Sequence, residues 1–309
     1  MANSGLIDLH THTNMSDGDY SPQELLRIAK ERGIVVIAVT DHDTVDGYDE
    51  ALFTYAKGLG ITLIAGIELS TIDEQSQQKI HVLGLFINPY DAQLREQCRQ
   101  LRQERIDLAR QVEHKLSACG FVLRIDELVR SGEIITKAHI ARDVLENVQN
   151  QQELVKAHGK IPMQGEFIET WLIAGCPAFV PKQAPLLTHE AIEIIHTAGG
   201  IASCAHPSFN VMKGFAFEDM CQLILRNRFD AVEAINIQYD KEHNDARCDM
   251  VADFSDFAAR KGLLVSGGSD YHSDNDELWG ARTELGMVNE EVRVTKEVVR
   301  QLTAGLPRL

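Results

Sequence analysis

The stretch Leu6-Ile7-Asp8-Leu9-His10-Thr11-His12 joins a short apolar run to two histidines placed two residues apart. In an extended strand, residues i and i+2 project to the same side, so His10 and His12 can present two imidazoles to one ion. One such pair is weak evidence, because solvated histidines are common at strand ends. The segments Thr40-Asp41-His42 and Ser269-Asp270-Tyr271-His272 also follow apolar runs. This recurrence indicates a metal-dependent hydrolase.

Apolar runs alternate with amphipathic helical patterns along most of the chain. The apolar runs predict strands at Leu6–Leu9, Ile34–Val39, Ile61–Ala65, Ile80–Phe86, Ile201–Ala205, Ala231–Ile235 and Leu263–Ser266. Helices are predicted at 21–32, where Ser21-Pro22 forms the start, and at 48–59, 188–197, 217–226 and 245–261. This alternation is typical of α/β proteins with mostly parallel strands.

Polar residues collect at the carboxyl ends of these predicted strands. They are His10 and His12, Asp41 and His42, Glu68, His206, and Asp270 and His272, while His81 lies inside its strand. Barrel enzymes place their catalytic residues where all strand ends converge, whereas an open doubly wound sheet concentrates ligands at one switch point. The wide spread of polar residues therefore favours a closed or nearly closed barrel.

Residues 88–180 interrupt the alternation. A long helix is predicted from Asp91 to Cys119, with Gly120 as its stop, and shorter helices at 139–148, 151–158 and 165–173. We expect a barrel domain formed by residues 1–87 and 181–309, with residues 88–180 as a helical insertion domain. The arginines of the long helix either face the cleft or, as we expect, lie on a solvated face; they are Arg95, Arg99, Arg102, Arg105 and Arg110.

Composition narrows the range of functions. The chain has 309 residues, 44% of them apolar, and a formal net charge of −16. Such an acidic surface disfavours tracking along nucleic acid, so small phosphorylated substrates or nucleic-acid ends are expected instead. The longest apolar run is too short to span a bilayer and the first residues lack a basic region, which predicts a cytoplasmic protein. The six scattered cysteines predict reduced thiols.

The ordered motifs resemble those of the PHP family, named for polymerase and histidinol phosphatase domains. They are DLHTHTxxSDG from Asp8, TDHDT from Thr40, GIELS from Gly66, HVLG from His81, AHP from Ala205 and SDxH from Ser269, and together they cover nearly the whole chain. The resemblance implies a distorted (β/α)7 TIM-like barrel with a helical insertion. It also implies two or three divalent ions, usually Mn²⁺, with Fe²⁺ and Zn²⁺ as alternatives suited to the same donors.

The resemblance further implies three ligand sets. They are His10, His12, Glu68 and Asp270 for one ion; Glu68, His81 and His206 for a second; and Asp17, His42 and His272 for a third. A metal-bridging hydroxide would then attack phosphorus. Asp41 and Asp43 are either carboxylates that orient imidazoles or loop caps, and Glu233 has no assigned role. Packing is expected for His114, His158, His189, His196 and His243.

Within the family, Ala138-His139-Ile140-Ala141-Arg142 and the helical region resemble nucleoside 3',5'-bisphosphate phosphatases and RNase AM type exoribonucleases. That likeness implies that Arg142 binds phosphate and that His139 binds phosphate or protonates the leaving oxygen. By spacing alone, the two residues are equally typical of a pair on an exposed helix face. Two positions depart from this branch, Lys137 where an arginine is usual and Cys176 where a lysine is usual.

We therefore expect a metal-dependent phosphoesterase that hydrolyses phosphomonoesters of nucleotides, namely 3',5'-bisphosphorylated nucleosides, nucleoside monophosphates or short RNA 5' ends. Lys137, His139 and Arg142 are the expected substrate-binding residues. Histidinol-phosphate phosphatase and a non-catalytic nucleotide-binding domain are the alternatives. Signatures of other catalytic classes, such as G-x-S-x-G, Walker A and H-E-x-x-H, do not occur in the sequence.

Overall fold

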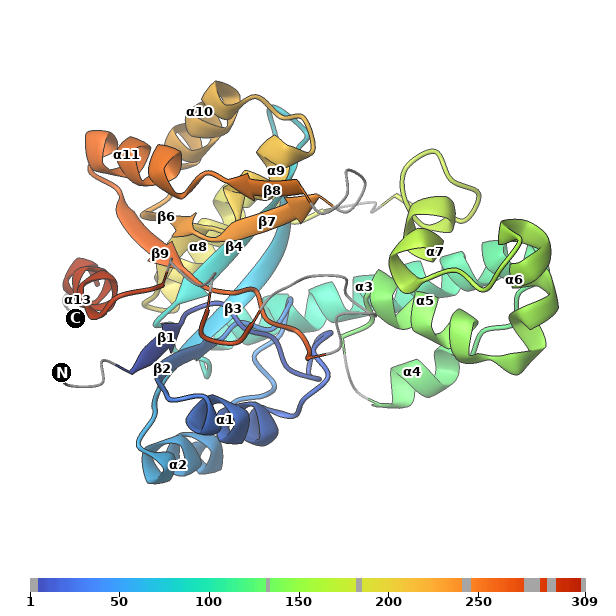
Figure 1. The fold of residues 1–309 in the computed structure, drawn as a ribbon, viewed down its shortest axis with the longest axis horizontal. Helices are drawn as coiled ribbons and strands as arrows, with labels where there is room; N and C mark the ends of the chain where they lie inside the picture. Colours follow the sequence, from blue (N-terminus) through green and yellow to red (C-terminus); the bar gives the residue numbers. More distant parts are fainter. Residues whose placement is uncertain are drawn as a thin grey trace.

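A computed structural model describes residues 5–131, 134–181, 185–240, 246–274, 284–287 and 293–306. His243 and the predicted helix start at Asp245 lie outside these residues. Figure 1 shows a sheet with helices around it and a group of helices that extends away from it. None of the described helices is both long and apolar enough to cross a membrane.

The central sheet contains every strand that the apolar runs predict. Its order is β1 (Leu6–Asp8), β2 (Ile34–Val39), β3 (Thr62–Ile72), β4 (Lys79–Leu85), β5 (Ile201–Cys204), β6 (Ala231–Ile235) and β9 (Leu264–Gly267). The strands are parallel except for β4, which runs antiparallel to β3 and β5. The predicted α/β class with mostly parallel strands is confirmed.

The third strand is longer than predicted. It continues past Ala65 to Ile72 because residues 66–72 pair with β4 in an antiparallel hairpin, in which Ser70 lies opposite His81. A second, two-stranded sheet of β7 (Ile237–Asp240) and β8 (Ala246–Asp249) was not predicted. The hairpin is functionally important, because it places Glu68 and His81 on neighbouring strands.

The two edge strands approach each other beyond their ends. Thr11 and Tyr271 form an isolated parallel bridge, with the His12 N–H donating to the Tyr271 carbonyl at 2.9 Å and the Asp270 N–H donating to the His10 carbonyl at 3.0 Å. In the described residues the β1 and β9 strands themselves do not pair, so the sheet does not form a closed ladder. The predicted closed or nearly closed TIM-like barrel is therefore not confirmed.

Helices pack on the sheet through apolar faces. They are α1 (Pro22–Glu31), α2 (Glu50–Leu59), α8 (Thr188–Thr197), α9 (Pro207–Met212), α10 (Phe217–Asn227), α11 (Val251–Lys261) and α13 (Lys296–Gly305). The start of α1 follows from its sequence, because the Ser21 side chain accepts the Glu24 N–H while the Glu24 carboxylate accepts the Ser21 N–H. Pro22 suits the first turn, which needs no N–H donor there.

The helices between β4 and β5 have an apolar cluster of their own. They are α3 (Ala92–Ala118), α4 (Ile125–Ser131), α5 (Lys137–Glu146), α6 (Gln151–His158) and α7 (Gln164–Trp171), with a short 3₁₀ turn at Val148–Asn150. The first half of α3 packs in the main core through Leu94 and Leu101, and its second half packs among α4–α7 through Val112 and Leu116. Helix α3 thus connects the two cores (Figure 1).

Candidate metal centre

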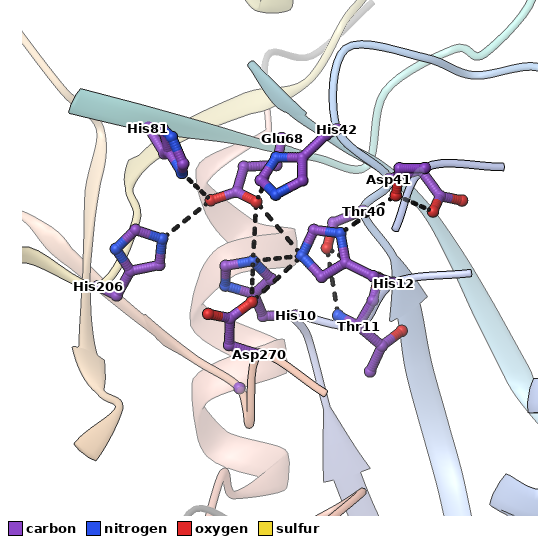
Figure 2. Close-up of polar contacts among 12 residues, drawn as sticks. His10, Thr11, His12, Thr40, Asp41, His42, Glu68, His81, His206 and Asp270 are labelled. Carbon is purple, nitrogen blue, oxygen red and sulfur yellow. Dashed lines mark hydrogen bonds and ion pairs between the residues drawn. The ribbon is translucent and has the colours of Figure 1, made fainter. Parts of the chain in front are cut away.

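The structure brings the predicted ligand side chains into one cluster beside the carboxyl ends of the strands. Figure 2 shows this cluster without Asp17 and His272 labelled. Three groups have ligand atoms that all lie within 4.8 Å of one another: His10, His12, Glu68 and Asp270; His42, Glu68 and His81; and His12, Asp17, His42 and His272. The first group matches a set implied by the family resemblance. His206 joins the cluster through Glu68, because its Nε2 lies 3.0 Å from Glu68 Oε1.

Glu68 lies at the centre of the cluster and is fully buried. Its Oε1 is 2.9 Å from the His81 Nδ1 and its Oε2 is 3.0 Å from the His42 Nδ1. The same Oε2 is 3.3 Å from the Nε2 atoms of both His10 and His12. The two oxygens of Glu68 therefore face different imidazoles, an arrangement that lets one carboxylate contact two ions.

Two aspartates add carboxylate oxygens to the cluster. Asp270 Oδ1 lies 3.2 Å from the Nε2 atoms of both His10 and His12. Asp17 Oδ1 lies 3.4 Å from the His272 Nε2, and Asp17 Oδ2 lies 3.8 Å from the His42 Nε2. Each part of the cluster thus mixes carboxylate and imidazole donors.

Buried carboxylates hold the loops that carry these ligands. Asp8, at the end of β1, accepts hydrogen bonds from the backbone N–H of Ser269 at 3.0 Å and of Gly286 at 2.7 Å. Asp41 accepts from the N–H and the hydroxyl of Thr13, both at 2.7 Å, and from the Ser16 hydroxyl at 2.6 Å. Asp41 therefore fixes the loop after His12, which supports the loop-cap alternative for this residue.

Sequence reasoning left Glu233 without a role, and the structure places it against two of the cluster histidines. The Oε1 of this buried β6 residue is 2.9 Å from the His10 Nδ1, and its Oε2 accepts the backbone N–H of His206 at 2.6 Å. With the His10 Nδ1–H directed at Glu233, the His10 Nε2 lone pair points into the cluster. A charged residue inside the apolar run Ala231–Ile235 was the signal for this role in the sequence.

Backbone strain is concentrated around the cluster. Positive φ angles occur at His206 (26°), Asp270 (56°) and Asp43 (55°), three of the six such residues other than glycine in the described chain. Residues other than glycine rarely adopt this backbone conformation, because it costs of order 1–3 kcal/mol per residue and persists only where the surrounding structure enforces it.

The charges in the cluster favour cations. Burial alone would raise the pKa of Glu68, Asp17 and Asp270, but the adjacent histidines hold all three pKa values below their ordinary range. Burial lowers the pKa of His42 to about 4, so its imidazole is neutral at physiological pH. Burial also disfavours charge on His12, yet the adjacent carboxylates of Asp270 and Glu68 favour its charged form and raise its pKa to about 10. A metal ion bound at His12 would take the place of that proton.

Several buried ligand atoms in the cluster make no hydrogen bond of suitable geometry among the described residues, although some of them lie close to other ligand atoms. They are Asp17 Oδ1, His42 Nδ1, Glu68 Oε2 and His206 Nδ1. A buried polar atom without a partner costs about 1–3 kcal/mol, so their concentration here calls for an explanation. Coordination of divalent cations explains it, and mixed imidazole and carboxylate donors suit Mn²⁺, Fe²⁺ and Zn²⁺. The residues present therefore fit a multinuclear metal centre.

The expected substrate-binding residues lie on the first two turns of α5. The His139 Nδ1 accepts the Thr136 N–H at 3.2 Å, which closes the start of the helix. Arg142 Nη2 donates to Asp19 Oδ1 at 3.3 Å, and the Asp19 N–H donates to the His272 carbonyl at 2.9 Å. Arg142 thus contacts the loop that also carries Asp17. His139 is buried and Arg142 half-buried, so the exposed-face alternative is wrong.

Lys137 and the position of Cys176 complete the comparison with the predicted substrate site. Lys137 is the first residue of α5. The Cys176 thiol donates to the Glu169 carbonyl at 3.1 Å, beyond the end of α7. No contact among the described residues joins Cys176 to the metal ligands.

Arg105 does not lie on a solvated helix face as predicted. Its guanidinium donates to Asp43 Oδ2, to the Ser70 hydroxyl at 3.1 Å and to the Ile135 carbonyl at 3.3 Å, and only 15% of the side chain is exposed. Asp43 follows His42 directly, so this buried pair connects α3 to the loop that carries a predicted ligand. The other carboxylate oxygen of Asp43 accepts the Ser70 N–H at 2.8 Å.

The remaining described histidines, His114, His158, His189 and His196, belong to none of the ligand groups. The His158 Nε2 accepts the Trp171 indole N–H at 3.0 Å, and the His196 Nε2 lies 2.7 Å from an Asp230 carboxylate oxygen.

A mostly parallel α/β sheet with clustered imidazoles and carboxylates at its strand ends defines a metal-dependent hydrolase. Comparison with known proteins gives the family. The PHP domain model matches residues 8–161. A 3',5'-nucleoside bisphosphate phosphatase from Chromobacterium violaceum is 30% identical over 305 residues, which cover 98% of each chain. The chain belongs to the PHP family, and it is a metal-dependent phosphoesterase.

Two further relatives agree with this family. A 5'-3' exoribonuclease from Haemophilus influenzae is 38% identical over 206 residues, which cover 65% of this chain and 68% of the relative. A crystal structure from Bifidobacterium adolescentis, of a protein proposed to be a metal-dependent phosphoesterase, superposes with a TM-score of 0.75. That structure is 24% identical and the superposition covers 98% of this chain and 97% of the other, which supports the fold.

Proposed function

We propose that this protein hydrolyses phosphomonoesters of nucleotides, with 3',5'-bisphosphorylated nucleosides, nucleoside monophosphates or short RNA 5' ends as substrates. The observation that carries the proposal is the position of Arg142. Its guanidinium donates to Asp19, in the loop that carries Asp17, and the Asp19 N–H donates to the His272 carbonyl, which supports a role for this cation in binding phosphate beside the proposed metal centre. Relatives named for nucleotide and RNA substrates support the same substrate class.

The proposed ligands are those implied by the family resemblance: His10, His12, Asp17, His42, Glu68, His81, His206, Asp270 and His272. Two or three divalent ions would occupy the cluster, and we propose manganese as the physiological metal. Bound divalent ions supply activated water at neutral pH and neutralise charge on phosphoryl oxygens. No protein nucleophile is then required.

The α5 residues bind the substrate in this proposal. Arg142 exchanges its contact with Asp19 for a phosphate group of the substrate, where its planar donors suit two oxygens at once. His139 is held in orientation by its bond to the Thr136 N–H and protonates the leaving oxygen. Lys137 adds positive charge at the start of the same helix.

The proposed domain division assigns these groups to two parts of the chain. Residues 1–87 and 181–309 form a distorted barrel that supplies every metal ligand, and residues 88–180 form the helical domain that supplies Lys137, His139 and Arg142. The pair of Arg105 with Asp43 holds the two parts in register. We place the protein in the cytoplasm.

A substrate panel tests this function. Chelator-treated protein reloaded with Mn²⁺ is assayed with adenosine 3',5'-bisphosphate, AMP, a 5'-phosphorylated oligoribonucleotide and histidinol phosphate. We expect phosphate release from the nucleotides and little from histidinol phosphate. Preferred hydrolysis of histidinol phosphate would reject the nucleotide substrate, and tight nucleotide binding without turnover by any metal form would indicate a binding module.

A further inference from the structure

A pocket of about 420 Å³ lies outside the metal cluster, between the β3–β4 hairpin and α9. Residues 77–79 of the hairpin line one side, and Phe209, Asn210, Lys213 and Phe215 line the other. The volume falls within the range of small-molecule sites, about 300–1,000 Å³. None of its described lining residues is a proposed metal ligand or belongs to α5.

The pocket adjoins the part of the cluster formed by His81 and His206. The Phe209 ring packs edge-on against the His206 ring, with centroids 6.0 Å apart. Lys79 lies two residues before His81 on β4, so both side chains project from the same side of the strand. The Asn210 side chain donates to the Lys79 carbonyl at 2.9 Å, which fixes α9 against β4. Figure 2 shows His81 and His206 together on one side of Glu68.

The chemistry of the pocket suits a nucleotide. Phe209 is 41% exposed. Aromatic residues make up only 6% of the chain. Gln77, Gln78 and Asn210 add amide donors and acceptors, and Lys79 and Lys213 add positive charge. No carboxylate is among the described lining residues, in a chain whose net charge is −16. Aromatic rings that stack on bases, with nearby cations for the backbone, are the usual means of binding single-stranded nucleic acid.

The pocket and Arg142 contact different parts of the metal cluster. Arg142 reaches it through Asp19, next to His272 and Asp17, while Phe209 reaches it through His206. A substrate whose phosphorus lies at the metal centre could therefore reach Arg142 with one part and the pocket with another. A nucleoside bisphosphate is long enough for one of these contacts, whereas a dinucleotide has a second nucleoside to offer the pocket.

We propose that this pocket binds the second nucleoside of a short 5'-phosphorylated oligonucleotide, with Phe209 stacking on its base. The inference rests on the proposed function, because it places the first nucleotide's 5'-phosphate at Arg142. Water oxygen bonds to the phosphorus between the two nucleosides, the bond from phosphorus to the first nucleoside's O3' breaks, and that O3' takes a proton. The products are a nucleoside 5'-monophosphate and a remainder that carries the 5'-phosphate.

The test compares two substrates that differ by the second nucleoside. The dinucleotide is 5'-phosphoadenosine linked to 2-aminopurine riboside, whose fluorescence falls on stacking, and the other substrate is adenosine 3',5'-bisphosphate. Phe209→Ala and Phe209→Trp are compared with Tyr55→Ala, which removes another exposed aromatic ring, on α2. Elemental analysis checks that each variant retains the metal content of the wild type.

We expect Phe209→Ala to lower kcat/KM for the dinucleotide about fivefold to a hundredfold, mainly through KM, as loss of base stacking predicts. Turnover of the bisphosphate should change less than about twofold, and Phe209→Trp and Tyr55→Ala should remain close to the wild type. Fluorescence quenching on binding should weaken in Phe209→Ala alone.

Three results would overturn the inference. An equal loss for both substrates would show that Phe209 acts only by supporting His206. Hydrolysis of the bisphosphate with no hydrolysis of the dinucleotide would reject the pocket and leave the proposed function intact. Failure to hydrolyse either substrate would reject the proposed function, and quenching that is the same in wild type and Phe209→Ala would then reject the pocket as well.

Discussion

Replacing Glu233 by glutamine should weaken metal binding without changing any proposed ligand. The substitution keeps the volume of this buried side chain but removes its charge. The wild-type carboxylate accepts two hydrogen bonds, from the His10 Nδ1–H and from the His206 N–H. A glutamine oxygen at the position of Oε2, which lies 3.1 Å from the His10 Nδ1 and 2.6 Å from the His206 N, can accept from both donors, but it is a neutral and therefore weaker acceptor.

The magnitude follows from the two bonds. A hydrogen bond to a charged group contributes about 1.5–3 kcal/mol and a neutral one about 0.5–1.5 kcal/mol, so each bond loses roughly 1.25 kcal/mol. Two bonds lose about 2.5 kcal/mol, which corresponds to roughly sixtyfold in affinity at about 1.4 kcal/mol per tenfold. Substitutions of groups that orient metal-bound histidines typically cost 10–100-fold, which agrees with this value.

Metal titration measures the effect directly. Chelator-treated wild-type and Glu233→Gln proteins are titrated with Mn²⁺ against a fluorescent chelator, with circular dichroism of the metal-free forms to confirm the fold. Glu193→Gln, an equivalent change on the exposed face of α8, is the matched control and should bind like the wild type. A change in Kd of less than about threefold in folded Glu233→Gln would refute the positioning role.

Three further predictions address the site, the fold and the substrate. Asp270→Asn should lower turnover by orders of magnitude with the fold intact, because a ligand charge is lost without loss of volume; unchanged turnover at full metal occupancy would exclude Asp270 from the centre. Burial raises the pKa of Asp73, but the hydrogen bonds that its carboxylate accepts from Arg226, Ser76 and Asn227 hold this pKa below its ordinary value. The difference in free energy of unfolding between wild type and Asp73→Asn should therefore be largest near pH 6, above the unfolded pKa of about 3.9. This difference should shrink as the pH falls through the lower folded pKa, and denaturant titrations that show no such change would contradict the prediction. Wild-type kcat/KM for nucleoside monophosphates should lie within roughly one to two orders of magnitude of the bisphosphates, and Cys176→Lys should widen the gap; a preference above about a thousandfold that the substitution leaves unchanged would show that other residues bind the second phosphate.

The α/β class and the convergence of the proposed ligands could be predicted from the sequence for the same physical reason. Parallel strands end at one edge of a sheet, so residues that follow successive apolar runs, such as His10 and His42, meet there. The antiparallel hairpin of β3 and β4 was not predicted, because its pairing depends on partners rather than on local pattern.

The sequence also could not predict contacts between segments that lie far apart along the chain. Nothing near Arg105 in the sequence indicates that it pairs with Asp43, which lies 62 positions earlier. A helix arginine is usually solvated, so the local pattern favoured the wrong environment. For Glu233 the sequence does give a signal, because a buried carboxylate inside an apolar strand is costly unless it has polar partners. The sequence cannot identify those partners, because they lie on other segments of the chain.

The positive φ angles at His206 and Asp270 lower the stability of the fold at two positions that the proposed function needs. Glycine adopts such angles without steric cost, so a backbone that only had to fold would favour glycine at both positions. Each position instead carries a side chain that we propose as a metal ligand. Replacing either residue by glycine would relieve the backbone strain and at the same time remove a proposed ligand, so selection for stability alone would act against this centre.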